Sequence, residues 1–166
     1  MARKLRGLLI LFAVLLVGCD HATKLAARSV LQGRTVDVVP GVLDLRYAEN
    51  HDTAFSLTYA LHSPHKGALL TALAVVGVLA VALLWWRRRG SSRAAQVGYA
   101  MLLAGAVGNV LDRIARGFVI DFIHVRYWPV FNVADALIVV GVVWLALVSR
   151  TSRGQNASSC ENSPRA

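Results

Sequence analysis

Four long apolar stretches restrict this chain to a membrane fold. Each has close to the ~20 residues that a helix needs to cross a bilayer. They lie approximately over residues 5–26, 67–86, 94–111 and 131–148. Only 16% of the 166 residues are charged, whereas about 25% are charged in ordinary soluble domains. The pattern predicts one all-α integral membrane domain over residues 1–148, with no room for a separate soluble domain.

The excess positive charge, formally +9, lies in three short segments. Arg and Lys residues precede the first apolar stretch, join the second stretch to the third, and follow the fourth. Four spans place these segments on one side of the membrane, and Lys and Arg concentrate on the cytoplasmic side. Both termini are therefore predicted to lie in the cytoplasm, and residues 149–166 to form a disordered cytoplasmic tail. Because topology explains the charge, we expect no nucleic-acid partner.

The segment between the first two spans faces outward in this topology and carries strand signals. Residues 36–39 and 42–47 are apolar in partial alternation, and Pro40-Gly41 between them is a turn pair. We expect a small extracytoplasmic β-hairpin, followed by an irregular or helical stretch that ends near His65.

Polar side chains recur near the outer ends of three spans, at spacings that put each group on one helix face. They are Asp20 and Lys24 in the first span, Asn109, Asp112, Arg113 and Arg116 in the third, and Asn132 and Asp135 in the fourth. We interpret Asp20 with Lys24, and Asp112 with Arg113 or Arg116, as ion pairs that hold the helices together. The asparagines are expected to form hydrogen bonds between helices or to orient carboxylates.

Two aspartates are harder to explain as structural residues. Asp135 lies about 6 Å of helix rise inside the membrane rim, where a carboxylate is costly. Asp121 lies in an apolar run, residues 119–123, that would hold it against the membrane surface. Two adjacent carboxylates cannot both ionise readily, so one keeps a proton while the other acts as a general base. We predict that Asp121 and Asp135 form a catalytic acid pair, with no metal and no cofactor.

Other classes fit the sequence less well. Neither His-Glu-x-x-His nor Gly-x-Ser-x-Gly occurs, so a zinc protease or a serine hydrolase lacks its motif. A small proton- or cation-coupled transporter stays an alternative, although its acids would lie near the bilayer midplane. A catalytically inactive relative is a second alternative. A third is an enzyme in which Asp52 is a catalytic acid. Residues 16–19 also fit a lipobox, which would make Cys19 a lipidated N-terminus.

Five motifs follow one another in a fixed order between residues 5 and 148. They are Asp20-His21-Ala22-Thr23-Lys24, Asn50 with Ala54-Phe55-Ser56, Gly108-Asn109-Val110-Leu111-Asp112-Arg113, Val119-Ile120-Asp121-Phe122 and Phe131-Asn132-Val133-Ala134-Asp135. In this order and within four spans, they resemble the motifs of the bacterial lipoprotein signal peptidases, the signal peptidase II family.

The resemblance implies a membrane-embedded aspartic endopeptidase of the bacterial inner membrane, with its active site near the outer face. Its substrates would be prolipoproteins with a diacylglyceryl group on the cysteine that follows the cut. Membrane lipids would be its other partners, and it would act as a monomer. The hairpin would be the β-cradle that lies on the membrane in this family, and residues 47–65 a lid-forming loop and helix.

The resemblance also implies roles for individual residues. Asp121 and Asp135 would be catalytic. The residues that line the pocket and contact substrate would be Asn50, Asn109, Arg113 and Asn132, with Asp20, Lys24 and Asp112 as a supporting polar shell. One motif departs from the family pattern, because Asp52 and Thr53 replace the usual Gly and Ala. Losing a glycine removes easy access to positive φ, which puts the local backbone path in question.

Overall fold

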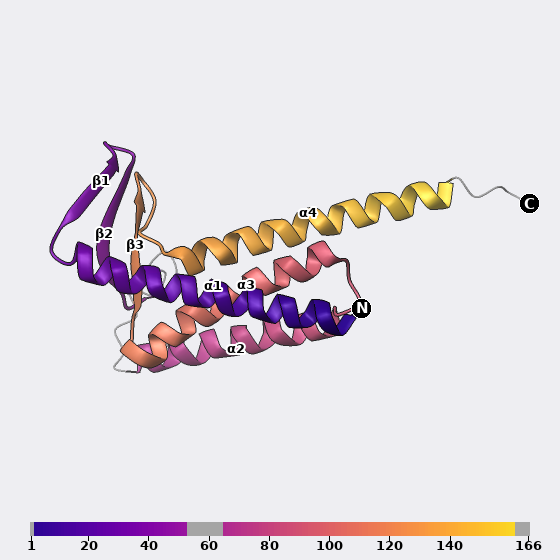
Figure 1. Ribbon diagram of the computed structural model, residues 1–166, viewed down its shortest axis with the longest axis horizontal. Coiled ribbons are helices and arrows are strands. Elements are labelled where there is room, and N and C mark those ends of the chain that lie inside the picture. Colours follow the sequence, from indigo (N-terminus) through magenta and orange to yellow (C-terminus); the bar gives the residue numbers. More distant parts are fainter. Residues whose placement is uncertain (1, 53–64, 162–166) are drawn as a thin grey trace, which may run out of the picture.

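The computed structural model describes residues 2–52 and 65–161, and it contains four long helices with a small sheet at one end (Figure 1). The helices are α1 (Ala2–Leu31), α2 (Lys66–Arg87), α3 (Arg93–Arg116) and α4 (Val133–Glu161). In the described part of the chain, all four are long and apolar enough to cross a membrane. The predicted fold class, four membrane-spanning helices with a small β element, is therefore confirmed.

The helix ends differ from the predicted spans at two places. The fourth helix begins at Val133 rather than at residue 131, because Asn132 caps it. It then continues to Glu161, so the backbone over residues 149–161 is helical, whereas a disordered tail was predicted from residue 149. No proline interrupts residues 133–161, and extending an existing helix gains one hydrogen bond for each residue fixed.

The sheet has three antiparallel strands in the order β1-β2-β3. The hairpin of β1 (Thr35–Val39) and β2 (Leu43–Asn50) was predicted, and its turn places Gly41 at φ 70°. The third strand, β3 (Val119–Val125), was not predicted. It pairs with β2, so that Asp121 lies opposite Ala48. The expected irregular or helical stretch after the hairpin falls mostly on residues 53–64, outside the described part of the chain.

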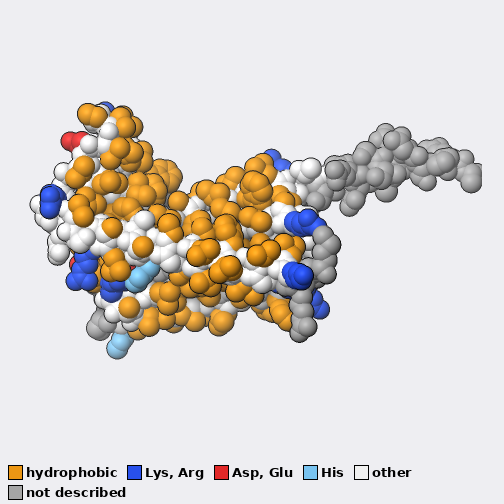
Figure 2. All heavy atoms as spheres, viewed as in Figure 1, with side chains coloured by type: hydrophobic (Ala, Val, Ile, Leu, Met, Phe, Trp, Pro, Cys, Tyr) orange, Lys and Arg blue, Asp and Glu red, His pale blue; other side chains and the backbone are white. Residues whose placement is uncertain are grey.

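Apolar side chains cover the outside of the helices, while many of the fully buried residues are polar. Figure 2 shows hydrophobic side chains along the middle of the bundle, with Lys and Arg side chains gathered toward its two ends. Leu8, Leu73 and Val139 are each more than half exposed. Among the largest described side chains that are almost completely buried, only Ile120 is apolar; the others are Lys24, Asn132, Asp20, Asp112 and Asp121. This distribution suits a lipid environment around a polar interior.

Glycines allow α3 to pack closely against α4 and α1. A Cβ at Gly105 would lie 2.3 Å from the carbonyl oxygen of Ala134, and one at Gly108 would lie 2.6 Å from Asp20 Oδ2. On α4, a Cβ at Gly141 would lie 2.9 Å from the backbone nitrogen of Leu102. Small residues at such crossings let helix backbones approach each other in a membrane.

Gly105→Ala is therefore expected to destabilise the protein, by about 1–3 kcal/mol as in other overpacked interiors. The new methyl group would push on the backbone of the first turn of α4. Gly77→Ala on α2 is the matched control, because a Cβ at Gly77 would meet nothing within 4 Å. Alanine is also the better helix former, so the control should be neutral or slightly stabilising. Thermal unfolding in detergent tests this, and equal Tm values for the two variants would contradict it.

Candidate active site

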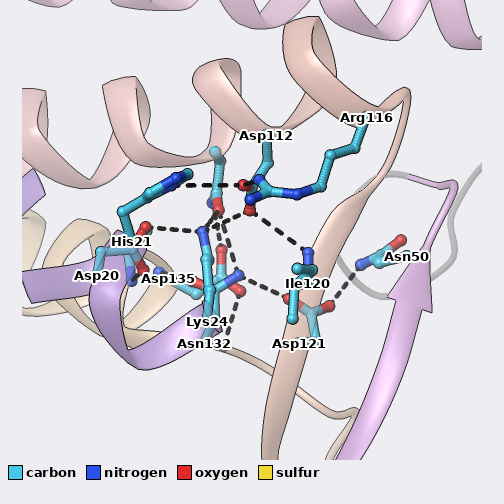
Figure 3. A network of polar contacts seen from close by, with 12 residues as sticks. Asp20, His21, Lys24, Asn50, Asp112, Arg116, Ile120, Asp121, Asn132 and Asp135 are labelled. Atoms are coloured by element: carbon cyan, nitrogen blue, oxygen red, sulfur yellow. Dashed lines mark hydrogen bonds and ion pairs between the residues drawn. The ribbon is translucent and has the colours of Figure 1, made fainter. Parts of the chain in front are cut away.

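The polar residues singled out in the sequence meet where the helices reach the sheet (Figure 3). Asp135 lies in the first turn of α4, and Asp121 lies in the middle of β3. The other contributions come from α1, α3 and the end of β2. The three helix faces predicted to lie at one membrane level thus converge on one cluster.

Asn132 links the two aspartates. Its Nδ2 donates to Asp121 Oδ1 at 2.6 Å, and its Oδ1 accepts from the backbone N–H of Asp135 at 2.9 Å. In return, the backbone N–H of Asn132 donates to Asp135 Oδ2 at 3.3 Å. This reciprocal exchange is a capping box, formed because an asparagine and an acid stand three residues apart at a helix start. The cap that begins α4 therefore also fixes Asp135 beside Asp121.

Asn109 on α3 supports the pair from the other side. Its Nδ2 donates to Asp135 Oδ1 at 2.7 Å. Its Oδ1 accepts from Lys24 Nζ at 3.1 Å and from Asn132 Nδ2 at 3.2 Å. Both predicted functions of the asparagines, bonding between helices and orienting carboxylates, are thus served by the same contacts.

A buried ion cluster lies behind Asn109. Lys24 Nζ lies 2.7 Å from Asp20 Oδ2 and 3.0 Å from Asp112 Oδ2, and Arg116 also pairs with Asp112. The predicted Asp20–Lys24 pair is present, and of the two alternatives for Asp112 the structure has Arg116 rather than Arg113. The carboxylates also hold the backbone, since Asp20 Oδ1 accepts from the N–H of Ala134 at 2.8 Å.

Two contacts, one in the ion cluster and one at the start of α2, could not be read from the sequence. Asp112 Oδ2 accepts from the backbone N–H of Ile120 at 3.4 Å, which ties α3 to β3. Lys66 at the start of α2 forms an ion pair with Asp52. Every residue except proline has a backbone N–H, so the residue type does not show which one will donate to a carboxylate. The Lys66 partner lies fourteen residues upstream, beyond the reach of helical periodicity.

Asn50 and Arg113 approach the acids from the end of the sheet. Asn50 Nδ2 donates to Asp121 Oδ2 at 2.9 Å, so both Asp121 oxygens accept an asparagine N–H. Arg113 Nη2 donates instead to the backbone carbonyl of Asp52, at 3.0 Å. Arg113 also interacts electrostatically with Asp135 and Asp121, although it donates its hydrogen bond to the backbone.

The environment of Asp121 favours its protonated form. Asp121 is only 2% exposed. Burial, followed by the negative charge of Asp135, raises the pKa of Asp121 to about 6, against opposing contributions from Asn50, Asn132 and Lys24. Such a shift is expected where two carboxylates share a site and cannot both ionise readily.

The rival features noted in the sequence lie elsewhere. The carboxylate of Asp52 is paired with Lys66. The only described non-glycine residue with positive φ is Tyr127, so Asp52 does not need the conformational freedom of glycine. Cys19 is an exposed free cysteine within α1. In the described residues, no group of three or more His, Cys, Asp or Glu side chains could hold a metal ion.

The sequence model of one protein family, described as signal peptidase (SPase) II, matches residues 12–150. The chain belongs to the signal peptidase II family. A lipoprotein signal peptidase of Geobacter metallireducens is 38% identical over 133 residues, which cover 77% of this chain and 81% of the relative. One of Pelotomaculum thermopropionicum is 37% identical over 140 residues, covering 84% and 88%.

Two solved bacterial membrane enzymes share the fold of this signal peptidase II chain. One has a TM-score of 0.71 at 25% identity and covers 85% of this chain and 91% of its own. The other has a TM-score of 0.69 at 26% identity and covers 89% and 91%. The chain is thus a multi-pass membrane protein and an aspartic peptidase, and the transporter alternative is not supported.

Proposed function

We propose that this protein cleaves signal peptides from diacylglyceryl-modified prolipoproteins, on the N-terminal side of the lipidated cysteine. Asp121 and Asp135 form the catalytic pair. The observation that carries this assignment is the bridge through Asn132, which bonds to both carboxyl groups. The relatives of this chain support the substrate assignment, since they are lipoprotein signal peptidases.

The pair can hydrolyse a peptide without a covalent intermediate. One carboxylate takes a proton from a water molecule as the water attacks the scissile carbonyl. The protonated partner polarises that carbonyl oxygen and then helps to protonate the leaving amine. The asparagine donors keep each acid oriented while the proton moves. Low local polarity strengthens the coupling between the two acids.

The protein functions in the inner membrane with both termini in the cytoplasm and the acid pair at the outer face. The distribution of Lys and Arg around the spans supports this orientation. Membrane lipids contact the sheet as well as the helices, because Val38, Val42, Tyr127 and Trp128 are each more than half exposed at the end of the sheet that holds the β1–β2 turn. Aromatic side chains of this kind are enriched at membrane interfaces. A monomer is sufficient, since one chain supplies both acids and their asparagine donors.

The test uses purified full-length protein in detergent with two forms of one prolipoprotein, with and without the diacylglyceryl group. We expect cleavage of the modified form, at the bond before its cysteine, and little cleavage of the unmodified form. A chelator should leave the rate unchanged. Cleavage of both forms at equal rates would overturn the substrate assignment, and loss of activity with chelator would overturn the metal-free mechanism.

The pH dependence of kcat/KM reports ionisation in the free enzyme. Below the pKa of Asp121, about 6, the pair keeps its shared proton; above that value the proton is lost. We therefore expect kcat/KM to fall as pH rises through this range. The measurement is a cleavage rate at limiting substrate across a pH series, with protein stability followed in parallel. A kcat/KM that rises through the same range would contradict the assignment.

A further inference from the structure

Asp52 attaches the end of the sheet to α2. It follows β2 by two residues, and its carboxylate forms an ion pair with Lys66, the first residue of α2. The Asp52 and Lys66 side chains are only 16% and 18% exposed. Water therefore screens this pair less than it screens an exposed surface pair.

The backbone of Asp52 is held on both sides. Its carbonyl oxygen accepts from Arg113 Nη2 at 3.0 Å, and its N–H donates to Asn50 Oδ1 at 2.9 Å. The second bond decides which end of the Asn50 amide faces the site. With Oδ1 occupied by Asp52, Nδ2 points at Asp121 Oδ2, 2.9 Å away (Figure 3). The opposite amide orientation would place an oxygen against the carboxylate and lose both bonds.

We propose that Asp52 is a positioning residue for the catalytic Asp121, acting through Asn50. The ion pair with Lys66 and the bond from Arg113 hold the Asp52 backbone, and the Asp52 N–H holds the Asn50 amide toward Asp121. The catalytic part of this inference rests on the proposed function. Asp52 thus supplies the carboxylate that binds Lys66, which a glycine at this position would lack.

A merely structural ion pair would stabilise the protein without affecting the ionisation of Asp121. The charged groups that face Asp121 are Asp135 from α4, Lys24 from α1 and Arg113 from α3. Among the described residues, the charged side chains of Lys66 and Arg113 face Asp52. The N–H of Asn50 stabilises ionised Asp121 and so lowers its pKa. Loosening Asn50 should therefore raise that pKa and move the alkaline limb of kcat/KM to higher pH.

The experiment compares Asp52→Asn and Lys66→Met, which break the same ion pair from its two ends, with the charge-exchanged double variant Asp52→Lys/Lys66→Asp. Asp37→Asn on β1 is the matched control, because Asp37 is exposed. We expect each single variant to lower the plateau of kcat/KM roughly fivefold, as for loss of one ordinary hydrogen bond, and to move the alkaline limb up by about half a pH unit. The double variant should recover most of the wild-type plateau of kcat/KM and most of the wild-type position of the alkaline limb. The control should match wild type.

A second readout does not depend on cleavage. The titration of the Asp121 carboxyl, followed by carbon-13 NMR of labelled protein, should move to higher pH in both single variants. Wild-type protein that fails to cleave any prolipoprotein would count against the proposed function, whereas this titration would still test Asp52. If neither the titration of Asp121 nor the alkaline limb of kcat/KM moves in the single variants, the positioning role is overturned, even if the variants lower Tm.

Discussion

Asp135→Asn and Asp121→Asn should each lower kcat for prolipoprotein cleavage by about 10³-fold, within the range for loss of a general acid or base. Either change leaves a single carboxyl group, which cannot act as the general base and the general acid at once. The double variant should be little worse than either single one, because residues that act as a unit do not contribute additively. Single-turnover cleavage in detergent is the measurement. Undiminished cleavage by either variant would refute the assignment.

Folding must be followed alongside these rates. Burying a carboxylate costs free energy, so each asparagine variant should retain the Tm of the wild type or exceed it. At both positions the two oxygens accept N–H groups. An asparagine can accept only one of the two without rearrangement, which offsets part of this gain. Asp37→Asn on the exposed face of β1 is the control. It should leave both rate and Tm unchanged.

Lys24→Met should lower the free energy of unfolding by about 3–5 kcal/mol, the usual effect of leaving a buried charge without its partner. Lys24 is completely buried between Asp20 and Asp112. Asp112 would keep Arg116, but Asp20 would lose Lys24, its one ion-pair partner among the described residues. Cleavage should fall as well, because Lys24 also donates to Asn109, which holds Asp135. Thermal unfolding and cleavage in detergent measure the two effects.

The double variant Asp20→Asn/Lys24→Met separates charge from packing. An asparagine at position 20 keeps an oxygen for the N–H of Ala134, the bond that holds the start of α4. With no unpaired charge left, the double variant should recover most of the lost stability. If Lys24→Met alone has the Tm of the wild type, the ion cluster does not stabilise this fold.

Local sequence rules predicted much of the site. Hydropathy located the spans, and helical spacing placed Asp20 with Lys24 and Asn132 with Asp135 on common faces. The polar ends of three helices had to meet because a membrane leaves few other places for them. The third strand was missed, since its partner β2 lies about seventy residues upstream. Strand pairing over that distance leaves no local pattern in the sequence.

The length of α4 was missed for a different reason. Low hydropathy after residue 148 indicates the end of a membrane span, but a helix need not end where the membrane does. The contacts of Asp52 were also out of reach. Its replacement of a glycine raised a question about backbone conformation, and only the structure gave the answer, which is a backbone without positive φ and an ion pair to Lys66.

The sequence by itself determined the four spans and their polar faces, and it singled out the two acids that we propose to be catalytic. Hydrophobicity and helical periodicity suffice for this because they act over short stretches of chain. Only the tertiary structure decided what brings the acids together. Asp121 is held in a strand against β2, Asp135 in a capping box, and Asn132 joins them. The pairing of β3 with β2 joins strands about seventy residues apart, and the bond from Asn132 to Asp121 spans eleven residues. The geometry of both contacts depends on how the strands and helices pack.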